Sequence, residues 1–495
     1  MKTIAKGGAV GMGGLVARTA LSIAIIPVIT RILGADGYGL YALSTRMLEA
    51  LALVLHFGFI SSIARFVAVY EGNRQREHTD GVIAGTSVIA LLAATAVSAV
   101  IALFPEWVSI GIYEKPLLTP VVRIAVIALP MLVVSQILGQ ATIAKGTVFY
   151  FTLSELVVDP VKLAGVLIFT VFAGWGVVGA AYSIPLYTAA RLVAAGAGIF
   201  LLFRGLKLSN IKHFEFGRVF LYSLPLMVAV LASFTVFQAA PLIGALWIDN
   251  AGIGIYAAVS SLFMIGMAGL TSVMNVFSPI MADLYSRGEM EKLDLTCQTT
   301  TRWIYHITMM PLLFLTLKSG SVVRLFGVEF GAGGTVVVIL GICFMGRVAG
   351  SYSGSLLSIA DRPWLTMVNN VAITAINFAL CFALVPKHGL NGLALATGIS
   401  TALGGLVPAA QTWWIFKLHP FKSRAVKPAL ALALAAPALL VIRLDPWWLD
   451  IIAAGAAFSI LYAALARFLC YEPEDRVIVD AAMRKIGLSR NPGGG

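Results

Sequence analysis

Two short segments of this chain repeat each other at a distance of 215 positions. Residues 37–43 read Gly-Tyr-Gly-Leu-Tyr-Ala-Leu, and residues 252–258 read Gly-Ile-Gly-Ile-Tyr-Ala-Ala. Each copy follows one long apolar run and opens another. Further pairs keep nearly the same offset, namely Tyr70 with Tyr285, Ile143 with Ile359, Gly176 with Gly389 and Gly179 with Gly392. A period of this length is too long for a solenoid repeat. It has the size of a six-helix bundle, which many transporters duplicate.

Composition indicates a membrane protein. The chain has 495 residues, of which 59% are hydrophobic and 12% charged, and its mean hydropathy is +0.92. A soluble protein carries about 25% charged residues, so a chain this apolar would aggregate in water. The net charge of +12 does not indicate nucleic-acid binding, because the Lys and Arg residues lie mostly in loops between apolar runs.

The apolar runs predict fourteen transmembrane helices and an all-α polytopic fold. A helical span needs about 20 mostly apolar residues, and lipid offers no partner for unpaired backbone groups. The predicted spans are 9–31, 42–64, 81–104, 120–143, 150–172, 177–203, 219–243, 253–278, 301–318, 334–358, 364–386, 390–416, 426–443 and 448–469.

The repeat divides the chain into two lobes. The first six predicted helices match the next six, and because six is even, both copies enter the membrane in the same direction. We therefore expect a parallel repeat with a first lobe over 1–203, an inter-lobe loop over 204–218 and a second lobe over 219–416. The two helices over 426–470 have no counterpart. The tail over 471–495 is predicted to carry a short amphipathic helix.

The distribution of Lys and Arg predicts the orientation. Most of the 35 basic residues lie in loops on the side that receives both termini, and such loops are cytoplasmic by the positive-inside rule. We expect a multi-pass protein of the cytoplasmic membrane. The loops on the other side are short, the longest being 105–119, and leave no room for an extracytoplasmic domain. The first apolar run has no small-residue cleavage site, so we do not expect it to be a cleavable signal.

Ionisable residues inside predicted spans are candidate functional residues. A charge at mid-helix costs about 2.5–3.5 kcal/mol on insertion scales, so it usually faces a cavity or a partner. Arg18, about seven residues into the first span, is interpreted either as a substrate-binding cation or as one half of an internal salt bridge. Arg46 and Glu49 lie one turn apart in the second span and either neutralise each other or face the cavity. His56 is more typical of a satisfied polar residue than of a proton carrier.

The fifth span carries three ionisable residues on one face. Glu155, Asp159 and Lys162 follow one another at the spacing of a helical stripe, and Pro160 removes a backbone donor and kinks the helix. We interpret this segment as a hinge and cavity wall, or as an ion-pair network with the arginines of the first two spans. Arg191 in the sixth span is typical of a helix-packing cation.

The second half replaces these charges with uncharged polar residues. At the 215 offset, the counterparts of Glu155, Asp159 and Lys162 are Asn370, Thr374 and Asn377. Arginines bind phosphate through two hydrogen bonds at once, whereas amides and hydroxyls suit sugars. Arg347 is the one charged residue deep in the second half. A position facing the cavity and a role in helix packing are equally compatible with it. The asymmetry indicates a substrate with an anionic end and a sugar end.

No motif of an enzyme or of an ATP-driven motor occurs in the sequence. The chain lacks GxxxxGK[ST], HExxH and GxSxG. Its four cysteines include no CxxC pair, so neither a metal site nor a cofactor nor a disulfide framework is expected. The glycine-rich segment over 327–334 is interpreted as a turn.

Five segments resemble one known family in their order and spacing. They are Arg-Ile-Leu-Gly-Ala-Asp-Gly-Tyr-Gly-Leu-Tyr at 31–41, Ser-Leu-Pro-Leu at 223–226, Gly-Ile-Tyr-Ala-Ala at 254–258, Phe-Ser-Pro-Ile at 277–280 and Arg-Gly-Glu at 287–289. The chain resembles polysaccharide exporters of the O-antigen flippase type over about residues 5–470. Their superfamily, the multidrug/oligosaccharidyl-lipid/polysaccharide exporters, also holds multidrug and toxin extrusion antiporters and the lipid II flippase.

The resemblance implies two six-helix lobes that form a V around a central cavity, and transport by alternating access. In the lipid II flippase, cavity arginines on the first two helices are linked to the substrate diphosphate. Arg18 and Arg46 occupy comparable positions. Exporters of this type often carry an acid late in the seventh helix, where this chain has Gln238.

We therefore expect a flippase for a lipid-linked oligosaccharide. Arg18 and Arg46 would bind the pyrophosphate with the help of Lys162. The glycan would contact the second-half stripe of Asn370, Thr374 and Asn377. Coupling to Na⁺ or H⁺ would use Glu49, Glu155 or Asp159. Membrane lipids and glycan-assembly proteins are the expected partners.

Three other classes of protein are weighed against this expectation. A cation-coupled drug antiporter of the same fold usually places an acid on its first helix, and residues 9–31 contain none. A membrane glycan polymerase or ligase usually needs a sizeable outer loop with catalytic residues, and none is present. A non-transporting scaffold is the third alternative.

Overall fold

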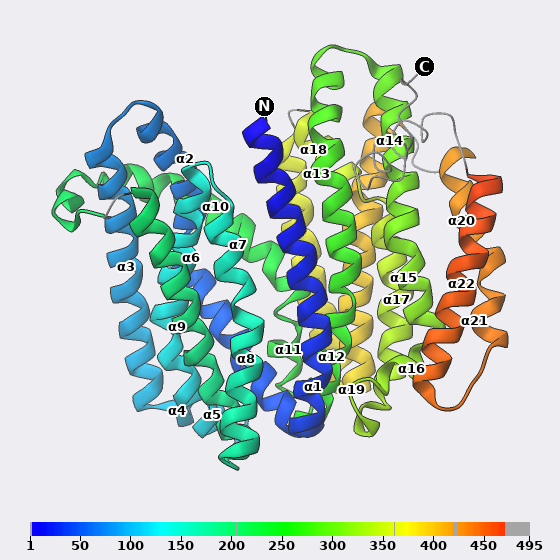
Figure 1. Ribbon diagram of the computed structural model, residues 1–495, viewed down its shortest axis with the longest axis horizontal. Coiled ribbons are helices and arrows are strands. Elements are labelled where there is room, and N and C mark those ends of the chain that lie inside the picture. The colour runs from blue at the N-terminus through cyan, green and yellow to red at the C-terminus, as the bar shows by residue number, and fades with distance from the viewer. Residues whose placement is uncertain (1, 204–205, 361, 419–422, 471–495) are drawn as a thin grey trace, which may run out of the picture.

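The protein is a helical membrane bundle. The computed structural model describes residues 2–203, 206–360, 362–418 and 423–470, and the regular secondary structure in these ranges is helical throughout (Figure 1). Eight helical segments within these ranges are long and apolar enough to cross a membrane. Two of them, Ala17–Leu55 and Trp364–Phe416, each join two predicted spans. The all-α polytopic fold is confirmed, whereas the count of fourteen spans stays a prediction.

The first half contains the helices that follow. They are α1 (Lys2–Leu55), α2 (Phe59–Gly72), α3 (Arg76–Leu103), α4 (Pro105–Ser109), α5 (Leu118–Ala125), η1 (Val126–Ala128), α6 (Leu129–Ala144), α7 (Phe149–Leu156), α8 (Val158–Val166), the π-helix η2 (Leu167–Phe172) and α9 (Gly176–Phe203).

The second half and the C-terminal helices continue in the same way. They are η3 (Leu208–His213), α10 (Phe216–Phe237), α11 (Ala240–Gly244), α12 (Asn250–Leu262), α13 (Met264–Ser286), α14 (Met290–Ile304), η4 (Tyr305–Met309), α15 (Met310–Leu317), α16 (Ser319–Val323), η5 (Val328–Phe330), α17 (Gly333–Ala349), α18 (Ser353–Ile359), α19 (Pro363–Phe416), α20 (Ser423–Ala435), α21 (Pro437–Val441) and α22 (Trp447–Leu469).

The helices gather in two groups with the start of α1 between them. In Figure 1, α3, α6 and α9 lie in one group, and α13, α15 and α17 lie in the other. We call the end of the bundle that holds the N-terminus the N-terminal face, and the opposite end the far face. The bends between α2 and α3 and between α13 and α14 lie on the N-terminal face, as a parallel repeat requires (Figure 1).

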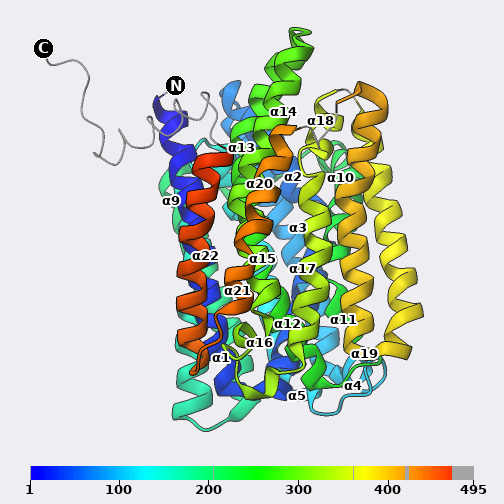
Figure 2. The same cartoon turned by 90° about the vertical axis from the view of Figure 1, so that its right-hand side faces the viewer.

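The C-terminal helices pack on the outer side of the second group, as Figure 2 shows. Their buried residues form a separate apolar cluster that contacts the side chains of α15. An ion pair reinforces this attachment, because Lys318 Nζ lies 2.7 Å from Asp450 Oδ1 and both side chains are almost completely buried. The predicted helix in the tail over 471–495 lies outside the described residues.

At two predicted loops, two successive helices meet directly at a sharp bend. α1 bends at Gly34 (φ 68°) and α19 bends at Gly389 (φ 51°). Glycine has no Cβ and adopts a positive φ without steric cost, so a single residue suffices to turn the chain at each position.

The second predicted helix is not continuous, contrary to expectation. The helical run over 42–64 is broken between Leu55 and Phe59, where Phe57 and Gly58 have φ values of 50° and 73°. A Cβ at Gly58 would lie 2.3 Å from the Ser223 carbonyl oxygen of α10. The break therefore lets α10 approach the backbone itself, and this tertiary contact overrides the helical pattern. The helix assignment is interrupted at Val157, three residues before Pro160, but Val157 keeps helical φ and ψ values of −67° and −26°, so the predicted kink at Pro160 stays a prediction.

The two repeated segments meet each other between the lobes, next to the bend at Gly34 on the far face. A Cβ at Gly39 would lie 1.9 Å from the Asn250 carbonyl oxygen, and a Cβ at Gly254 would lie 2.1 Å from the Ala35 carbonyl oxygen. Both the glycines and the carbonyl residues are separated by the repeat offset of 215 positions. The contact is therefore symmetric, and each copy of the repeated segment packs its glycine against the backbone of the other copy.

A second pair of glycines confirms the match between the halves. Gly176 and Gly389 both have a positive φ, 57° and 51°. Three residues later, a Cβ at Gly179 would lie 2.4 Å from the Phe169 carbonyl oxygen, and a Cβ at Gly392 would lie 2.3 Å from that of Leu384. In both halves, the sixth helix starts against the backbone of the fifth.

A methyl group at the central contact should separate the lobes. In the Gly39→Ala variant, the new Cβ cannot share space with the Asn250 carbonyl, and overpacking of this kind costs about 1–3 kcal/mol. We expect the midpoint of thermal unfolding in detergent to fall. The matched control is Gly196→Ala in α9, where a Cβ would meet nothing within 4 Å. That control should be neutral or slightly stabilising, and equal midpoints for both variants would contradict the close contact.

Candidate functional site

The charged residues predicted inside the first lobe gather around Glu155. Its carboxylate forms ion pairs with both Arg18 of α1 and Arg191 of α9. Close packing one turn away sets this arrangement, because a Cβ at Gly14 would overlap the side chain of Thr152. Glu155 and Arg191 are largely buried, whereas the Arg18 side chain is 44% exposed. Of the alternatives for these residues, the interhelical ion pair is the one that forms in this conformation.

Arg46 forms a second group of contacts with both lobes. Its Nη1 lies 2.7 Å from Glu49 Oε2, so the expected pair within the helix is formed. The same nitrogen donates to Gln238 Oε1 at 2.8 Å. Gln238 lies between α10 and α11, so this bond joins the two halves of the chain. Because glutamine is neutral, it holds the guanidinium in place without cancelling its charge.

Asp159 and Lys162 form the third group. Lys162 Nζ lies 2.7 Å from Asp159 Oδ1 and 5.6 Å from the ring centroid of Tyr187 in α9. Tyr187 is half-buried and lies within electrostatic range of Glu49, Asp159 and Arg191. The three groups therefore belong to one site.

We call this site the first-lobe charge cluster. It consists of Arg18, Arg46, Glu49, Glu155, Asp159, Lys162 and Arg191. Four of its members are bases and three are acids, so the cluster carries one positive charge in excess. The excess arises where two arginines share a single carboxylate. An arginine that is half exposed and shares its counter-ion is suited to bind an anion.

The predicted stripe of the second lobe is divided. Asn370 and Thr374 are half-buried on α19. Asn377, in contrast, is completely buried and its Nδ2 donates to Ser400 Oγ at 3.2 Å and to the Ala396 carbonyl at 3.4 Å. In this conformation Asn377 joins the two halves of α19 and is not open to a ligand, so the expected glycan contact does not apply to it here.

The buried asparagine nevertheless corresponds to its counterpart in the first lobe. Lys162 contacts Tyr187, and Asn377 contacts Ser400. The offsets of these two pairs, 215 and 213 positions, fall within the range of the repeat. The same helix-to-helix contact is therefore made by a cation and a ring in one lobe and by an amide and a hydroxyl in the other.

Three further residues take structural positions. His56 is buried in the break between α1 and α2. Arg347 packs against the second half of α19, where its Nη1 donates to the Gly404 carbonyl oxygen at 2.8 Å. Arg123 lies on the surface and pairs with Glu106. Of the two interpretations of Arg347, packing is the one that this conformation supports.

A set of polar contacts joins the lobes at the far face. Arg31 Nε donates to the Leu325 carbonyl at 2.9 Å, and Lys115 Nζ donates to that of Ile248 at 2.8 Å. The carboxylate of Glu329 accepts from the Ala35 backbone N–H at 2.9 Å, where the helix restarts after Gly34. An anionic side chain at a helix start is stabilising. We call these contacts the far-face latch.

The environment of Lys115 also indicates a tight contact at the far face. Burial lowers the pKa of the Lys115 amine, while the nearby carboxylates of Asp249 and Asp36 raise it. The lysine is therefore held between the lobes by charge as well as by its hydrogen bond.

Sequence reasoning missed three of these functional contacts. Gln238 drew notice only as a departure from a family pattern, and Glu329 lies in the segment interpreted as a turn. The reciprocal pair of Asn369 and Gln411, with bonds of 2.7 and 2.9 Å, joins the two halves of α19. The signals available in the sequence were an acid among glycines and amide side chains inside predicted spans. Among the described residues, no group of three or more His, Cys, Asp or Glu side chains is arranged to hold a metal ion.

Known structures share this fold. The chain is similar to the lipid II flippase MurJ in an inward closed conformation, with a TM-score of 0.71, 15% identity and coverage of 92% of this chain and 99% of that one. It is also similar to an inward-facing multidrug resistance MATE family transporter of the MOP superfamily, with a TM-score of 0.66, 16% identity and coverage of 83% and 98%. A MOP superfamily transporter from Pyrococcus furiosus gives a TM-score of 0.55 at 17% identity, with coverage of 84% and 96%.

These likenesses show the fold: the chain folds like the membrane transporters of the MOP superfamily. A family profile narrows this class. The profile described as polysaccharide biosynthesis protein matches residues 4–285, more than half of the chain, so the protein belongs to that family. No curated protein matches the sequence.

Loss of Glu155 should destabilise the first lobe. The Glu155→Ala variant leaves the buried Arg191 without its counter-ion, and breaking a buried pair in this way costs about 3–5 kcal/mol. Thermal unfolding in detergent should show a clear fall of the midpoint. Glu106→Ala is the matched control, since it removes a carboxylate from an exposed pair with Arg123 and should cost at most about 1 kcal/mol. A midpoint like that of the control would refute the shared ion pair.

Proposed function

We propose that this protein is a flippase that moves a lipid-linked oligosaccharide, with a polyprenyl-diphosphate carrier, across the cytoplasmic membrane for surface polysaccharide assembly. Membership of the polysaccharide biosynthesis family and the likeness to a lipid II flippase support the proposal. The protein acts as a transporter and not as an enzyme, in line with the absence of catalytic motifs from the sequence.

The observation that carries this proposal is the excess positive charge of the first-lobe charge cluster. Two arginines share Glu155, and the more exposed of them, Arg18, uses one nitrogen for that pair. Arg46 likewise uses one nitrogen for both of its partners. A guanidinium has five N–H donors, so both side chains retain donors for phosphate oxygens. The diphosphate would bind between Arg18 and Arg46, with Lys162 assisting.

The acids of the cluster would hold the cations while no substrate is bound. Glu155 and Glu49 each pair with an arginine to which the diphosphate would bind. When the phosphates bind, these carboxylates lose a partner and gain affinity for a proton or Na⁺. Coupling of an ion to transport through Glu49, Glu155 or Asp159 would follow from this competition.

The glycan would extend toward the second lobe. Asn370 and Thr374 on α19 are half-buried and carry an amide and a hydroxyl, which suit the hydroxyl groups of sugars. In this conformation Asn377 would support the helix that carries them and would contact the glycan only after α19 rearranges. The lipid tail would remain in the bilayer between the lobes.

The direction of transport follows from charge. We assign the N-terminal face to the cytoplasm, because its loops carry most of the basic residues. The far-face latch then closes the extracytoplasmic side in this conformation. Release of the substrate would require the latch to open while the lobes close on the cytoplasmic side. Outward movement of an anion is favoured by a negative interior by about 2.3 kcal/mol per charge per 100 mV.

Removal of both phosphate-binding arginines should abolish export. The Arg18→Ala/Arg46→Ala variant loses several charge-assisted hydrogen bonds, each contributing about 1.5–3 kcal/mol, so flipping should fall by at least about 100-fold. The assay follows a fluorescent lipid-linked oligosaccharide in proteoliposomes. The double variant Arg123→Ala/Arg287→Ala removes two exposed cations and should leave the rate unchanged. Normal flipping by the first variant would overturn the assignment.

Position 238 separates the effect of charge from that of hydrogen bonding. Gln238→Glu places a carboxylate on Arg46 and neutralises a cation that the phosphate requires. Gln238→Ala removes only one neutral-acceptor bond, which contributes about 0.5–1.5 kcal/mol to positioning. We expect Gln238→Glu to reduce the flipping rate more than Gln238→Ala does in the same proteoliposomes. A flipping rate of Gln238→Glu above that of Gln238→Ala would exclude phosphate binding at Arg46.

A further inference from the structure

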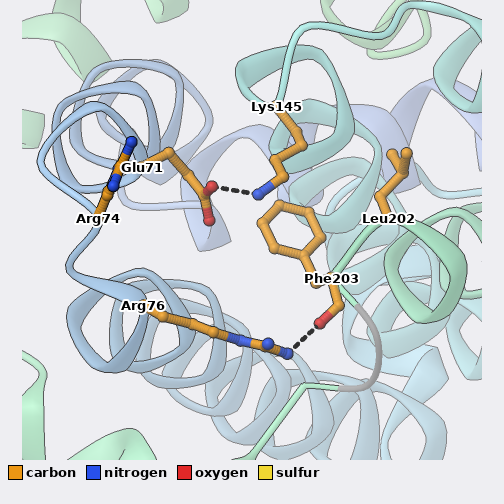
Figure 3. Close-up of a pocket in the computed structure, with 6 residues that line it drawn as sticks. All are labelled: Glu71, Arg74, Arg76, Lys145, Leu202 and Phe203. Carbon is orange, nitrogen blue, oxygen red and sulfur yellow. Dashed lines mark hydrogen bonds and ion pairs between the residues drawn. The ribbon is translucent and has the colours of Figure 1, made fainter.

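A second basic site lies in the first lobe, at the N-terminal face. A pocket of about 300 Å³ opens there between the ends of α2, α6 and α9 and the start of α3 (Figure 3). It is lined by Glu71, Arg74, Arg76, Lys145, Leu202 and Phe203. None of these residues belongs to the first-lobe charge cluster, and the proposed transport function gives them no role.

Three cations and one carboxylate line this pocket, so it carries two positive charges in excess. Lys145 forms an ion pair with Glu71 and lies 5.1 Å from the ring centroid of Phe203. Arg76 Nη2 donates to the Phe203 carbonyl oxygen at 2.5 Å. Figure 3 shows the Lys145–Glu71 ion pair and the Arg76–Phe203 hydrogen bond on opposite sides of the pocket. Within the described ranges, Arg74 forms neither a hydrogen bond through its side chain nor an ion pair.

The fold alone does not require these cations. Basic residues near helix C-termini often serve only to cap free carbonyl groups. If capping alone explained the three cations, the equivalent helix ends of the second lobe should carry cations as well. The bend from α13 to α14 shares the backbone hydrogen bonds that turn the chain between α2 and α3. The backbone bonds Arg74 to Glu71 and Gln75 to Tyr70 correspond to Gly288 to Tyr285 and Glu289 to Leu284.

This correspondence assigns an uncharged counterpart to each cation. Gly288 is the structural counterpart of Arg74. Met290, the first residue of α14, is the counterpart of Arg76, the first residue of α3. Lys145 and Ala360 each follow the last helical residue of α6 and α18. The second lobe therefore makes the same bend, and ends the corresponding helix, with an uncharged residue at each of these three positions.

Arg74 keeps its side chain at a position that favours glycine. Its φ is 59°, and that of its counterpart Gly288 is 70°. A Cβ is strained in this left-handed region, and glycine is not. A bend that served only to reverse the chain would be more stable with glycine here, as in the second lobe. Strained residues that persist cluster at binding sites, so the arginine points to a ligand.

The surroundings of the pocket favour a lipid as its ligand. The pocket lies at the end of apolar helices, where phospholipid headgroups lie, and basic pockets between helices at this level bind anionic headgroups. Its apolar wall, Leu202 and Phe203, belongs to the last turn of α9. The adjacent residues Phe200 and Leu201 are 68% and 60% exposed on the outside of the bundle, where acyl chains would contact them.

We propose that this pocket binds the phosphate headgroup of an acidic membrane phospholipid. Arg74 and Arg76 would bind the phosphate oxygens, and Lys145 would turn from Glu71 toward them. The bound lipid would hold together the ends of α2, α6 and α9, so it would stabilise the first lobe at the N-terminal face.

The glycine variant gives a sharp test because it should not damage the fold. Arg74→Gly removes the cation and the strain together, so the unfolding midpoint in phosphatidylcholine nanodiscs should stay equal or rise. The stabilisation on adding phosphatidylglycerol should be lost, and the affinity for this lipid, measured by native mass spectrometry, should fall by at least about tenfold. The variant Arg74→Gly/Arg76→Gln should show no preference for phosphatidylglycerol over phosphatidylcholine.

Lys292→Gln is the matched control, since it removes an exposed cation beside the equivalent bend of the second lobe and should keep the lipid preference of the unaltered protein. An unchanged preference in Arg74→Gly/Arg76→Gln would overturn the proposal. Stabilisation by inorganic phosphate in phosphatidylcholine nanodiscs, equal to that by phosphatidylglycerol, would overturn it in favour of a soluble anion. These measurements do not depend on flipping, so they remain decisive if the transport proposal fails.

Discussion

The contact between α1 and α12 at Gly39 and Gly254 determines how the lobes meet. Each glycine leaves room for a carbonyl oxygen of the other lobe, so two helix backbones touch directly where side chains would normally separate them. Arg46 lies two turns beyond Gly39 on the same helix, and this closeness brings its guanidinium within reach of Gln238. The charged site and the inter-lobe contact are therefore consequences of the same repeated segment.

The sequence predicted those features that depend on spacing within one element or on the repeat. The membrane fold, the Arg46–Glu49 pair as one of two alternatives, and the match of Gly176 with Gly389 belong to this class. Features that need a distant partner were out of reach. Glu329 binds a backbone group 294 positions away, and the break at Gly58 forms because α10 approaches there.

The two lobes share a backbone frame and differ in the chemistry mounted on it. Lys162 with Tyr187 and Asn377 with Ser400 make the same contact between successive helices. A duplicated frame offers two equivalent positions, and only one of them needs to keep a charge. One lobe therefore keeps charged side chains while the other has neutral hydrogen-bonding groups at the equivalent positions, with the same contact between the helices.

The C-terminal helices touch more than the lobe on which they rest. Trp447, the first residue of α22, lies under the guanidinium of Arg31 at 5.5 Å, and Arg31 is itself a member of the far-face latch. Lys318 and Asp450 fix the same end of α22 to the second lobe. The C-terminal pair therefore spans the joint between the lobes at the far face, and any opening there must break this stacking contact. The two C-terminal helices therefore add contacts that resist separation of the lobes at the far face.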